Sequence, residues 1–137
     1  MDAVVLDVSI CIPWCCEDEV SDLAEQLLDH AASLHPLHVP SIWPWEITNV
    51  LLVSIRRQRI TAEQMAQFFT LLSRFDIRLA PPPAVSDLLR LTALAQRHSL
   101  TTYDAAYLDL ATRLSLPLAT LDDALRKAAL AQGLTVL

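Results

Sequence analysis

Glycine is almost absent from this sequence of 137 residues, and its scarcity excludes two common kinds of nucleotide site. The single glycine is Gly133. A P-loop needs two glycines at fixed spacing, and the fingerprint of dinucleotide-binding domains needs two or three. We therefore expect no phosphate-binding loop of either kind.

Long apolar runs are missing as well, although the mean hydropathy is +0.37. A membrane-spanning helix needs about 18 consecutive apolar residues, and the longest uncharged stretch, residues 31–45, is interrupted by prolines and histidines. The first basic residue is Arg56, so the chain lacks the basic start of a secretory signal. We expect no membrane association, and we expect the apolar excess to be covered by packing or by a partner.

Cysteine is scarce and crowded into six positions, at Cys11, Cys15 and Cys16. An odd number at this spacing builds no disulfide framework, and no second Cys/His pair stands at the spacing of a zinc site. Together with the missing signal, this pattern predicts a reducing cytoplasm.

Positive charge is absent from residues 1–55, which hold nine acids, whereas residues 56–137 hold all ten bases. The net charge is −6, and proteins that bind nucleic acid by phosphate attraction are usually basic overall. A nucleic-acid function would need local arginines, such as Arg56, Arg57 and Arg59, or a metal ion that reverses the local sign of charge. A solvated helix end is the simpler interpretation of these arginines.

Short apolar segments alternate with amphipathic segments along the whole chain. The predicted strands are residues 4–6, 37–39, 77–79, 118–119 and 135–136, and the predicted helices cover about residues 11–16, 20–32, 44–57, 61–73, 85–95, 101–114 and 122–132. Alternation of this kind indicates a parallel sheet covered by helices on both faces. The expected fold is a single α/β domain over residues 1–137.

Four carboxylates fall at one edge of this predicted sheet. Asp7 and Asp122 follow predicted strands, and Glu46 and Asp104 stand in the first turns of predicted helices. The carboxyl ends of parallel strands share one edge, where α/β proteins bind ligands. Carboxylates gathered without basic partners repel one another unless a cation compensates. The set therefore predicts a site for Mg²⁺ or Mn²⁺, which prefer oxygen ligands.

Other interpretations stay open for single residues. Each of the four acids alone could cap a helix or favour its positive end. Ser9 and Thr120, each two residues from an aspartate of the set, could hydrogen-bond a carboxylate or a metal-bound water, or cap a helix. Asp109 is expected to be solvated, because it stands about 140° around the helix from Asp104.

The aromatic and apolar side chains also have two interpretations. The three tryptophans, at positions 14, 43 and 45, could stack on RNA bases, but we expect them in the core or in pocket walls. The apolar residues of the helices at 44–57 and 61–73 could supply a dimer surface, with core packing expected for most of them.

Four segments of the chain resemble, in order and spacing, the PIN domain of VapC-type toxin ribonucleases. They are VVLDVSICIPW, VPSIWPWEITNVL, TTYDAAYLDLA and LATLDDALRKAA, and they extend over nearly the whole sequence. The most specific parts are the strand-Asp-x-Ser start, the proline six residues before Glu46, the Tyr-Asp-Ala-x-Tyr run and the Thr-x-Asp-x-x-Leu run.

The resemblance implies a Mg²⁺- or Mn²⁺-dependent endoribonuclease with a three-layer α/β/α sandwich and a five-stranded parallel sheet. It implies that the catalytic and metal-binding acids are Asp7, Glu46, Asp104 and Asp122. Ser9 and Thr120 match the supporting hydroxyls of the family. Asp122 and Asp123 are adjacent candidates for the fourth acid, and the spacing from Thr120 favours Asp122.

The same resemblance implies a set of partners. The substrates would be structured RNAs such as tRNA or rRNA, cleaved by metal-activated water. The protein would form a homodimer, and a cognate antitoxin would block the acidic pocket with its tail. In this hypothesis Asp7 and Asp104 are the principal metal ligands, Asp122 completes the site through water, and Glu46 positions or deprotonates the attacking water.

Rival functions differ from this one at identifiable positions. A phosphatase with an aspartyl nucleophile would carry a second aspartate where Ser9 stands. A phospho-accepting receiver would carry a late lysine outside a helix, but the only lysine, Lys127, lies inside a predicted helix. A PIN-fold module that binds RNA or a protein without cleaving it, and a stand-alone RNA-processing nuclease, remain as alternatives.

Overall fold

Four short parallel strands form the centre of the molecule. The structure is a computed structural model that describes residues 2–16 and 18–137. The strands are β1 (Val4–Leu6), β2 (Leu37–Val39), β3 (Ile77–Leu79) and β4 (Leu118–Ala119), in the spatial order β3-β2-β1-β4. Val5 of β1 is in register with His38 on one side and with Leu118 on the other. β1 is therefore an inner strand, and its three residues are completely buried.

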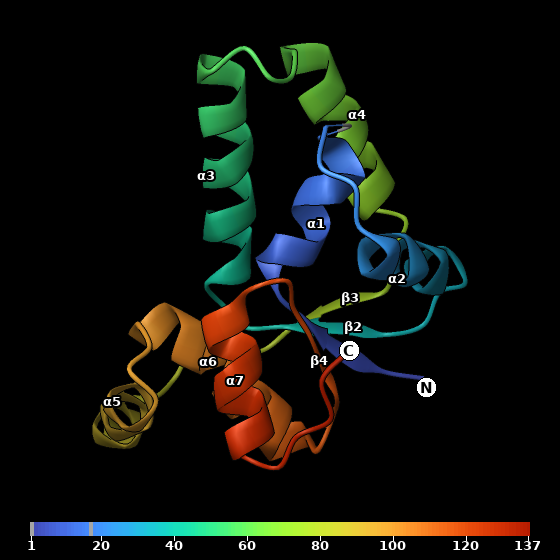
Figure 1. The fold of residues 1–137 in the computed structure, drawn as a ribbon. Coiled ribbons are helices and arrows are strands. Elements are labelled where there is room, and N and C mark those ends of the chain that lie inside the picture. The colour runs from blue at the N-terminus through green and yellow to red at the C-terminus, as the bar shows by residue number, and fades with distance from the viewer. Residues whose placement is uncertain (1, 17) are drawn as a thin grey trace.

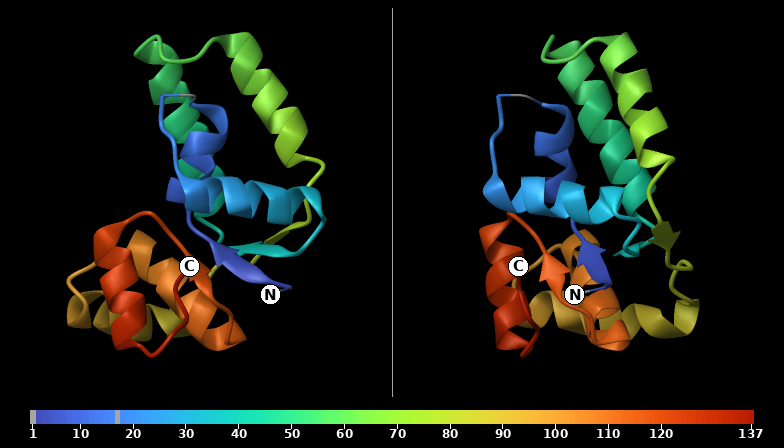
Figure 2. Two further views of the ribbon diagram at one scale, coloured as in Figure 1. Left: turned by 45° about the vertical axis from the view of Figure 1, so that its right-hand side comes forward. Right: turned by 90° about the vertical axis from the view of Figure 1, so that its right-hand side faces the viewer.

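Seven α-helices and one short 3₁₀ helix cover the sheet within the described residues. They are α1 (Val8–Cys15), α2 (Asp22–Ala32), α3 (Trp43–Arg56), α4 (Ala62–Leu72), η1 (Val85–Asp87), α5 (Leu88–Arg97), α6 (Thr102–Leu114) and α7 (Asp123–Ala131). Figure 1 shows α1 to α4 on one side of the strands and α5 to α7 on the other, and the views of Figure 2 agree. This arrangement confirms the predicted three-layer α/β/α sandwich.

Local sequence sets several of the helix starts. Thr61 accepts a hydrogen bond from the backbone N–H of Gln64, whose side chain accepts one from the N–H of Thr61, forming the capping box that the sequence predicts. Thr101 caps α6 in the same way by accepting from the N–H of Asp104. Pro44 stands in the first turn of α3, where the missing N–H costs nothing.

Two elements differ from the sequence prediction. α1 begins at Val8, three residues earlier than expected, so Asp7 stands at its N-cap position. The fifth predicted strand, at residues 135–136, is reduced to one isolated bridge between Leu118 and Val136. β4 is only two residues long, so the returning chain can align a single residue pair with it, and the sheet has four strands instead of five.

Within the described residues, no helix has both the length and the apolar character to cross a membrane.

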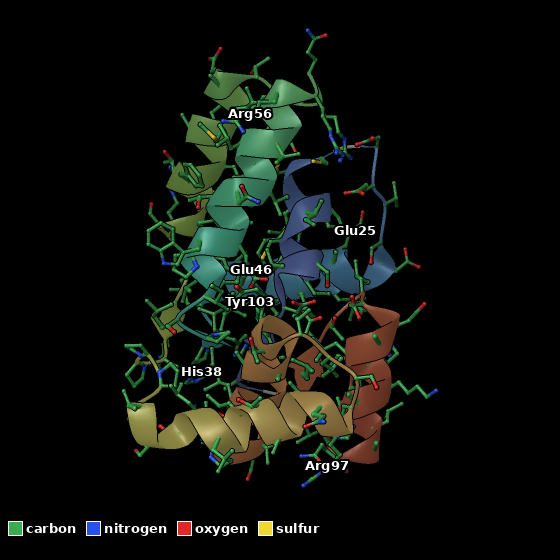
Figure 3. All side chains as sticks on the ribbon, turned by 90° about the vertical axis from the view of Figure 1, so that its left-hand side faces the viewer. Glu25, His38, Glu46, Arg56, Arg97 and Tyr103 are labelled. Carbon is green, nitrogen blue, oxygen red and sulfur yellow. The ribbon has the colours of Figure 1, made fainter. Side chains whose placement is uncertain are left out.

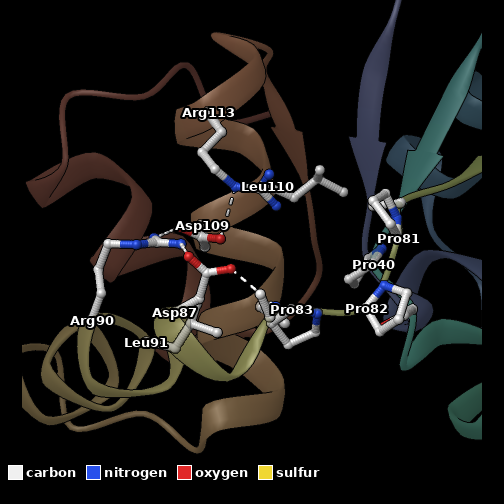
Figure 4. Close-up of a pocket in the computed structure, with 14 residues that line it drawn as sticks. Pro40, Pro81, Pro82, Pro83, Asp87, Arg90, Leu91, Asp109, Leu110 and Arg113 are labelled. Carbon is white, nitrogen blue, oxygen red and sulfur yellow. Dashed lines mark hydrogen bonds and ion pairs between the residues drawn. The ribbon is translucent and has the colours of Figure 1, made fainter.

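The prediction that Asp109 is solvated is wrong. Asp109 is 6% exposed, and its carboxylate forms ion pairs with Arg90 of α5 and with Arg113 of α6, where Nε of Arg113 lies 2.9 Å from Oδ2 (Figure 4). The helical angle places Asp109 away from Asp104 as expected, but α5 packs against that face of α6 and covers it. Asp109 is therefore a structural acid that joins the two helices.

We expect Asp109→Asn to lower the free energy of unfolding by about 1–3 kcal/mol, because both arginines lose a charged partner. Urea unfolding measures the change. Glu25→Gln, at an exposed position of α2, is the matched control and should stay within about 0.5 kcal/mol of the wild type. Equal stability of Asp109→Asn and the wild type would show that these ion pairs do not support the fold.

Candidate active site

Asp7 is the most buried of the four predicted acids, with 4% of its surface exposed. Its side chain does not cap α1, although the residue occupies the N-cap position. Instead its Oδ2 accepts hydrogen bonds from the hydroxyl of Ser9 at 2.6 Å and from the hydroxyl of Thr120 at 2.8 Å. Of the three interpretations open for these hydroxyls, the structure therefore shows a bond to the carboxylate.

The same two hydroxyls fasten the loop after β4 to Asp7. Thr120 is completely buried, and its Oγ1 accepts from the backbone N–H of Asp122 at 3.0 Å. Oγ of Ser9 accepts from the N–H of Leu121 at 2.9 Å. This small network fixes the distance between the end of β1 and the start of α7.

Asp122 caps α7, because its Oδ1 accepts from the N–H of Leu125 at 2.8 Å. The capping interpretation is thus correct for Asp122. Its charge also acts on two of the other predicted acids. The charge of Asp122 contributes to raising the pKa of both Asp7 and Asp104. Both Asp122 and Asp123 are exposed, and it is the charge of Asp122 that acts on Asp7 and Asp104, which favours Asp122 as the fourth acid.

Glu46 lies in the first turn of α3, and this end of the helix is the one nearer the sheet (Figure 3). Its side chain is half-buried, and its Oε1 accepts a hydrogen bond of 2.6 Å from the hydroxyl of Tyr107. Tyr107 lies on α6 and is the largest fully buried side chain of the described residues. Burial raises the pKa of Tyr107, and its bond to Glu46 raises that pKa further, so the phenol stays protonated and donates.

Sequence reasoning gave Tyr107 no function, although it lies within the Tyr-Asp-Ala-x-Tyr run. The helical spacing of the sequence did indicate that Tyr107 lies near the acids. Tyr107 follows Asp104 by three residues, so the two side chains share one face of α6, and that face is the one expected to meet the other acids.

Burial and mutual repulsion act together on the acids. Burial is the main cause of the raised pKa of Asp7. The hydrogen bonds from the hydroxyls of Ser9 and Thr120 act in the opposite direction and lower that pKa. Burial also raises the pKa of Glu46 and of Asp104, and the charge of Asp7 adds to both. Within the described residues, the main charge effects on these three carboxyls come from other carboxylates.

The donor set fits a hard divalent cation held partly through water. Among residues 2–16 and 18–137, no three His, Cys, Asp or Glu side chains are placed so that they could hold a metal ion together. Mg²⁺ commonly keeps several waters and binds through one or two carboxylates, so it does not require three protein ligands. Carboxylates that repel one another and lack a basic partner are the ligands that suit it.

The arginines named from the sequence lie away from this site. Arg56 is at the opposite end of α3 from Glu46, about 15 Å away along the helix axis (Figure 3). Arg59 is engaged by Asp18, at 3.2 Å, and by Glu19. This arginine cluster therefore belongs to the end of a helix and does not contribute to the acidic site.

The tryptophans follow the sequence prediction at two positions of three. Trp43 is buried, and the partly buried Trp14 donates from Nε1 to the carbonyl oxygen of Ala24 at 2.7 Å. Trp45 is 73% exposed, so its predicted core or pocket-wall position is wrong. The buried face of α3 runs through Trp43, Ile47 and Leu51, which leaves Trp45 on the outer face.

A separate pocket of about 210 Å³ lies between α5, α6 and the prolines that follow β3 (Figure 4). Pro40 and Pro81–Pro83 form one wall, and Arg90 and Arg113 lie at the other, already paired with Asp109. None of the four acids lines this pocket.

Comparisons with known proteins agree with this architecture. Residues 4–130 match the family model described as the PIN domain. The chain is 30% identical over 119 residues to "Ribonuclease VapC3" of Pyrobaculum aerophilum, and that alignment covers 87% of this chain and 88% of the relative.

Two solved structures share the fold. PAE2754 from Pyrobaculum aerophilum superposes with a TM-score of 0.71 and 22% identity, covering 98% of this chain and 83% of that chain. FitAcB from Neisseria gonorrhoeae superposes with a TM-score of 0.59 and 17% identity, covering 98% and 96% respectively.

The metal-free protein should lose stability as the pH rises. The pKa values of Asp7, Glu46 and Asp104 are raised in the folded state above the ordinary values of 3.8 for Asp and 4.5 for Glu. The folded state therefore binds more protons than the unfolded state, and this contribution to stability is complete below the ordinary values and is lost as the pH rises through the raised ones.

Urea unfolding in EDTA, from pH 4 upward, measures this loss. Asp7→Asn should show a shallower decline than the wild type, because one of the repelling carboxylates no longer ionises. Glu25→Gln removes an exposed acid outside the cluster and should keep the wild-type slope. Identical slopes for Asp7→Asn and the wild type would contradict the electrostatic description.

Proposed function

The chain belongs to the PIN domain family, with a VapC-type relative over most of its length, and on that premise we propose that it is a metal-dependent endoribonuclease, the toxin of a toxin–antitoxin pair. One observation carries the proposal. Asp7, Glu46, Asp104 and Asp122 come from four separate parts of the chain, yet Thr120 bonds both to the carboxylate of Asp7 and to the backbone N–H of Asp122, and the charge of Asp7 helps to raise the pKa of Glu46 and of Asp104.

The residues divide into distinct functions in this proposal. Asp7 and Asp104 would hold Mg²⁺ or Mn²⁺ directly, and Asp122 would complete the coordination through water. A bound divalent ion supplies an activated water and neutralises charge that develops on a phosphodiester. Ser9 and Thr120 fix the orientation of Asp7, since both donate to the same carboxylate oxygen.

Glu46 would orient or deprotonate the attacking water. Burial and the charges of Asp7 and Asp104 raise its pKa toward the range in which a carboxylate is an effective general base. Its half-buried position, with one oxygen already bonded to Tyr107, restricts the directions in which it can accept a proton.

The proposed substrate is structured RNA, such as tRNA or rRNA. A protein of net charge −6 gains little from general attraction to phosphate. A divalent ion at the acidic site would reverse the sign of charge at the one place where the phosphodiester must approach. We therefore expect RNA binding to depend on the metal ion.

The alternatives are separated by chemistry at the same site. An aspartyl phosphatase needs a general acid two residues after its nucleophile, but Ser9 stands there, and its hydroxyl donates a hydrogen bond to Asp7 itself. A binding module without cleavage would bind metal and RNA and show no turnover. A stand-alone RNA-processing nuclease would cleave RNA without any antitoxin.

The proposed partners are a cognate antitoxin, whose tail would block the acidic pocket, and a second copy of the chain in a homodimer. Core packing is the correct interpretation for Leu51, Phe68 and Leu72, which are buried. Leu52 of α3 is exposed, as are Val85 and Leu89 outside helices α3 and α4. The proposed setting is the cytoplasm, where free thiols such as those of this chain persist.

We expect Mn²⁺ or Mg²⁺ to stabilise the folded protein. An ion that binds only the folded state adds about 2.7 kcal/mol at a concentration 100 times its dissociation constant. Thermal unfolding with and without the ion measures the effect, which should shrink in Asp7→Asn and Asp104→Asn and persist in Asp109→Asn. An equal response of all four proteins would place the ion elsewhere.

We expect the purified protein to cleave RNA in the presence of Mn²⁺. Asp7→Asn and Glu46→Ala should each reduce the cleavage rate at least about 100-fold, as is typical for loss of a group used in proton transfer or in placing the reacting water. Gel analysis of a labelled tRNA and rRNA pool measures it, with Asp109→Asn as the active control. Equal cleavage by Asp7→Asn and the wild type would refute the nuclease proposal, whereas metal binding without turnover would favour the binding module.

A further inference from the structure

One hydrogen bond connects the two helical layers at the acidic site. Glu46 belongs to α3, which lies on one side of the sheet, and Tyr107 belongs to α6, which lies on the other (Figures 1 and 2). Their 2.6 Å bond is the only side-chain hydrogen bond between α3 and α6 among the described residues. The position of Glu46 relative to the other acids therefore depends on this contact.

The donor in this bond is rigid and the acceptor is not. Tyr107 is completely buried in the core, so its ring and hydroxyl have a fixed position. Glu46 has three rotatable side-chain bonds and is only half-buried. A fixed donor that holds a mobile carboxylate determines where that carboxylate lies.

The same face of α6 carries an acid of the cluster. Asp104 stands three residues before Tyr107, so one turn of this helix presents a proposed metal ligand and, beneath it, the donor that holds Glu46. The spacing between Asp104 and Glu46 is thereby linked to the geometry of a single helix.

We propose that Tyr107 is a positioning residue for the reaction: its hydroxyl occupies Oε1 of Glu46 and leaves Oε2 as the oxygen that acts on the attacking water or on the water shell of the metal ion. This inference rests on the proposed nuclease function. It assigns Tyr107 no contact with substrate, and it makes Glu46 a group that works through one oxygen.

The test is a double-mutant cycle of Tyr107→Phe and Glu46→Ala. Tyr107→Phe removes the hydroxyl and keeps the buried ring, and groups that orient an active-site ligand typically contribute about 10–100-fold to activity. We expect a loss of that size in kcat for RNA cleavage with Mn²⁺, with KM unchanged. In the Glu46→Ala background the same substitution should have no further effect on kcat.

Tyr103→Phe is the matched control. It removes a phenolic hydroxyl from the same helix at a position that is 60% exposed, and it should leave kcat unchanged. A second cycle measures the urea midpoint of the metal-free protein, where a real bond makes the shifts of Tyr107→Phe and Glu46→Ala non-additive.

The outcomes separate the two levels of the inference. Additive midpoint shifts would overturn it, because the bond would then not exist in solution. The inference would also be overturned if the midpoint shifts were non-additive but Tyr107→Phe lowered kcat equally in the wild-type and Glu46→Ala backgrounds. Tyr107 would then be a structural residue only. If the wild type cleaves no RNA, the nuclease function fails and Tyr107 loses its proposed role, while the midpoints still report whether the bond forms.

Discussion

Repulsion among carboxylates held at the carboxyl edge of a parallel sheet is the constraint on which the rest of this structure depends. Asp7 is buried at the end of the inner strand β1, and the hydroxyls of Ser9 and Thr120 contact its carboxylate. Folding must bring the acids together against their mutual repulsion. The hydrophobic core around β1 supplies the stabilisation that makes this possible.

The strands are short because burial, rather than length, stabilises them. β1 has three residues, all completely buried, and it pairs with β2 and β4 at once. Each strand delivers the chain to the same edge, after which the chain turns into a helix or a loop. Asp7 and Thr120 lie at these turns, so the sheet register and the Asp7–Thr120 hydrogen bond specify each other.

Local patterns predicted what depends on local sequence. Strand ends, helix caps such as Thr61 and the placement of the acids after strands all follow from a few neighbouring residues, and the sequence was sufficient to predict them. Asp109 was not predictable in this way, because one of its partners, Arg90, lies 19 residues earlier on a helix whose packing the sequence does not display. For Tyr107, helical spacing placed the ring on the face of Asp104, but the sequence did not show that its acceptor is Glu46, which lies 61 residues away. The fifth strand was predicted where only one residue pair aligns.

Two buried aspartates in this one chain show how a structural acid differs from a functional one. Asp109 is paired with Arg90 and Arg113, so its charge is balanced within the chain. Asp7 is buried to a similar extent, yet the charges that act on it within the described residues are negative, and its pKa is raised. A chain with ten bases places two of them on Asp109 and leaves Asp7 beside other acids. Selection for stability alone would disfavour the second arrangement, because a buried charge without a partner of opposite sign is destabilising. The proposed function accounts for it, since acids that bind a divalent cation would be retained in spite of that cost.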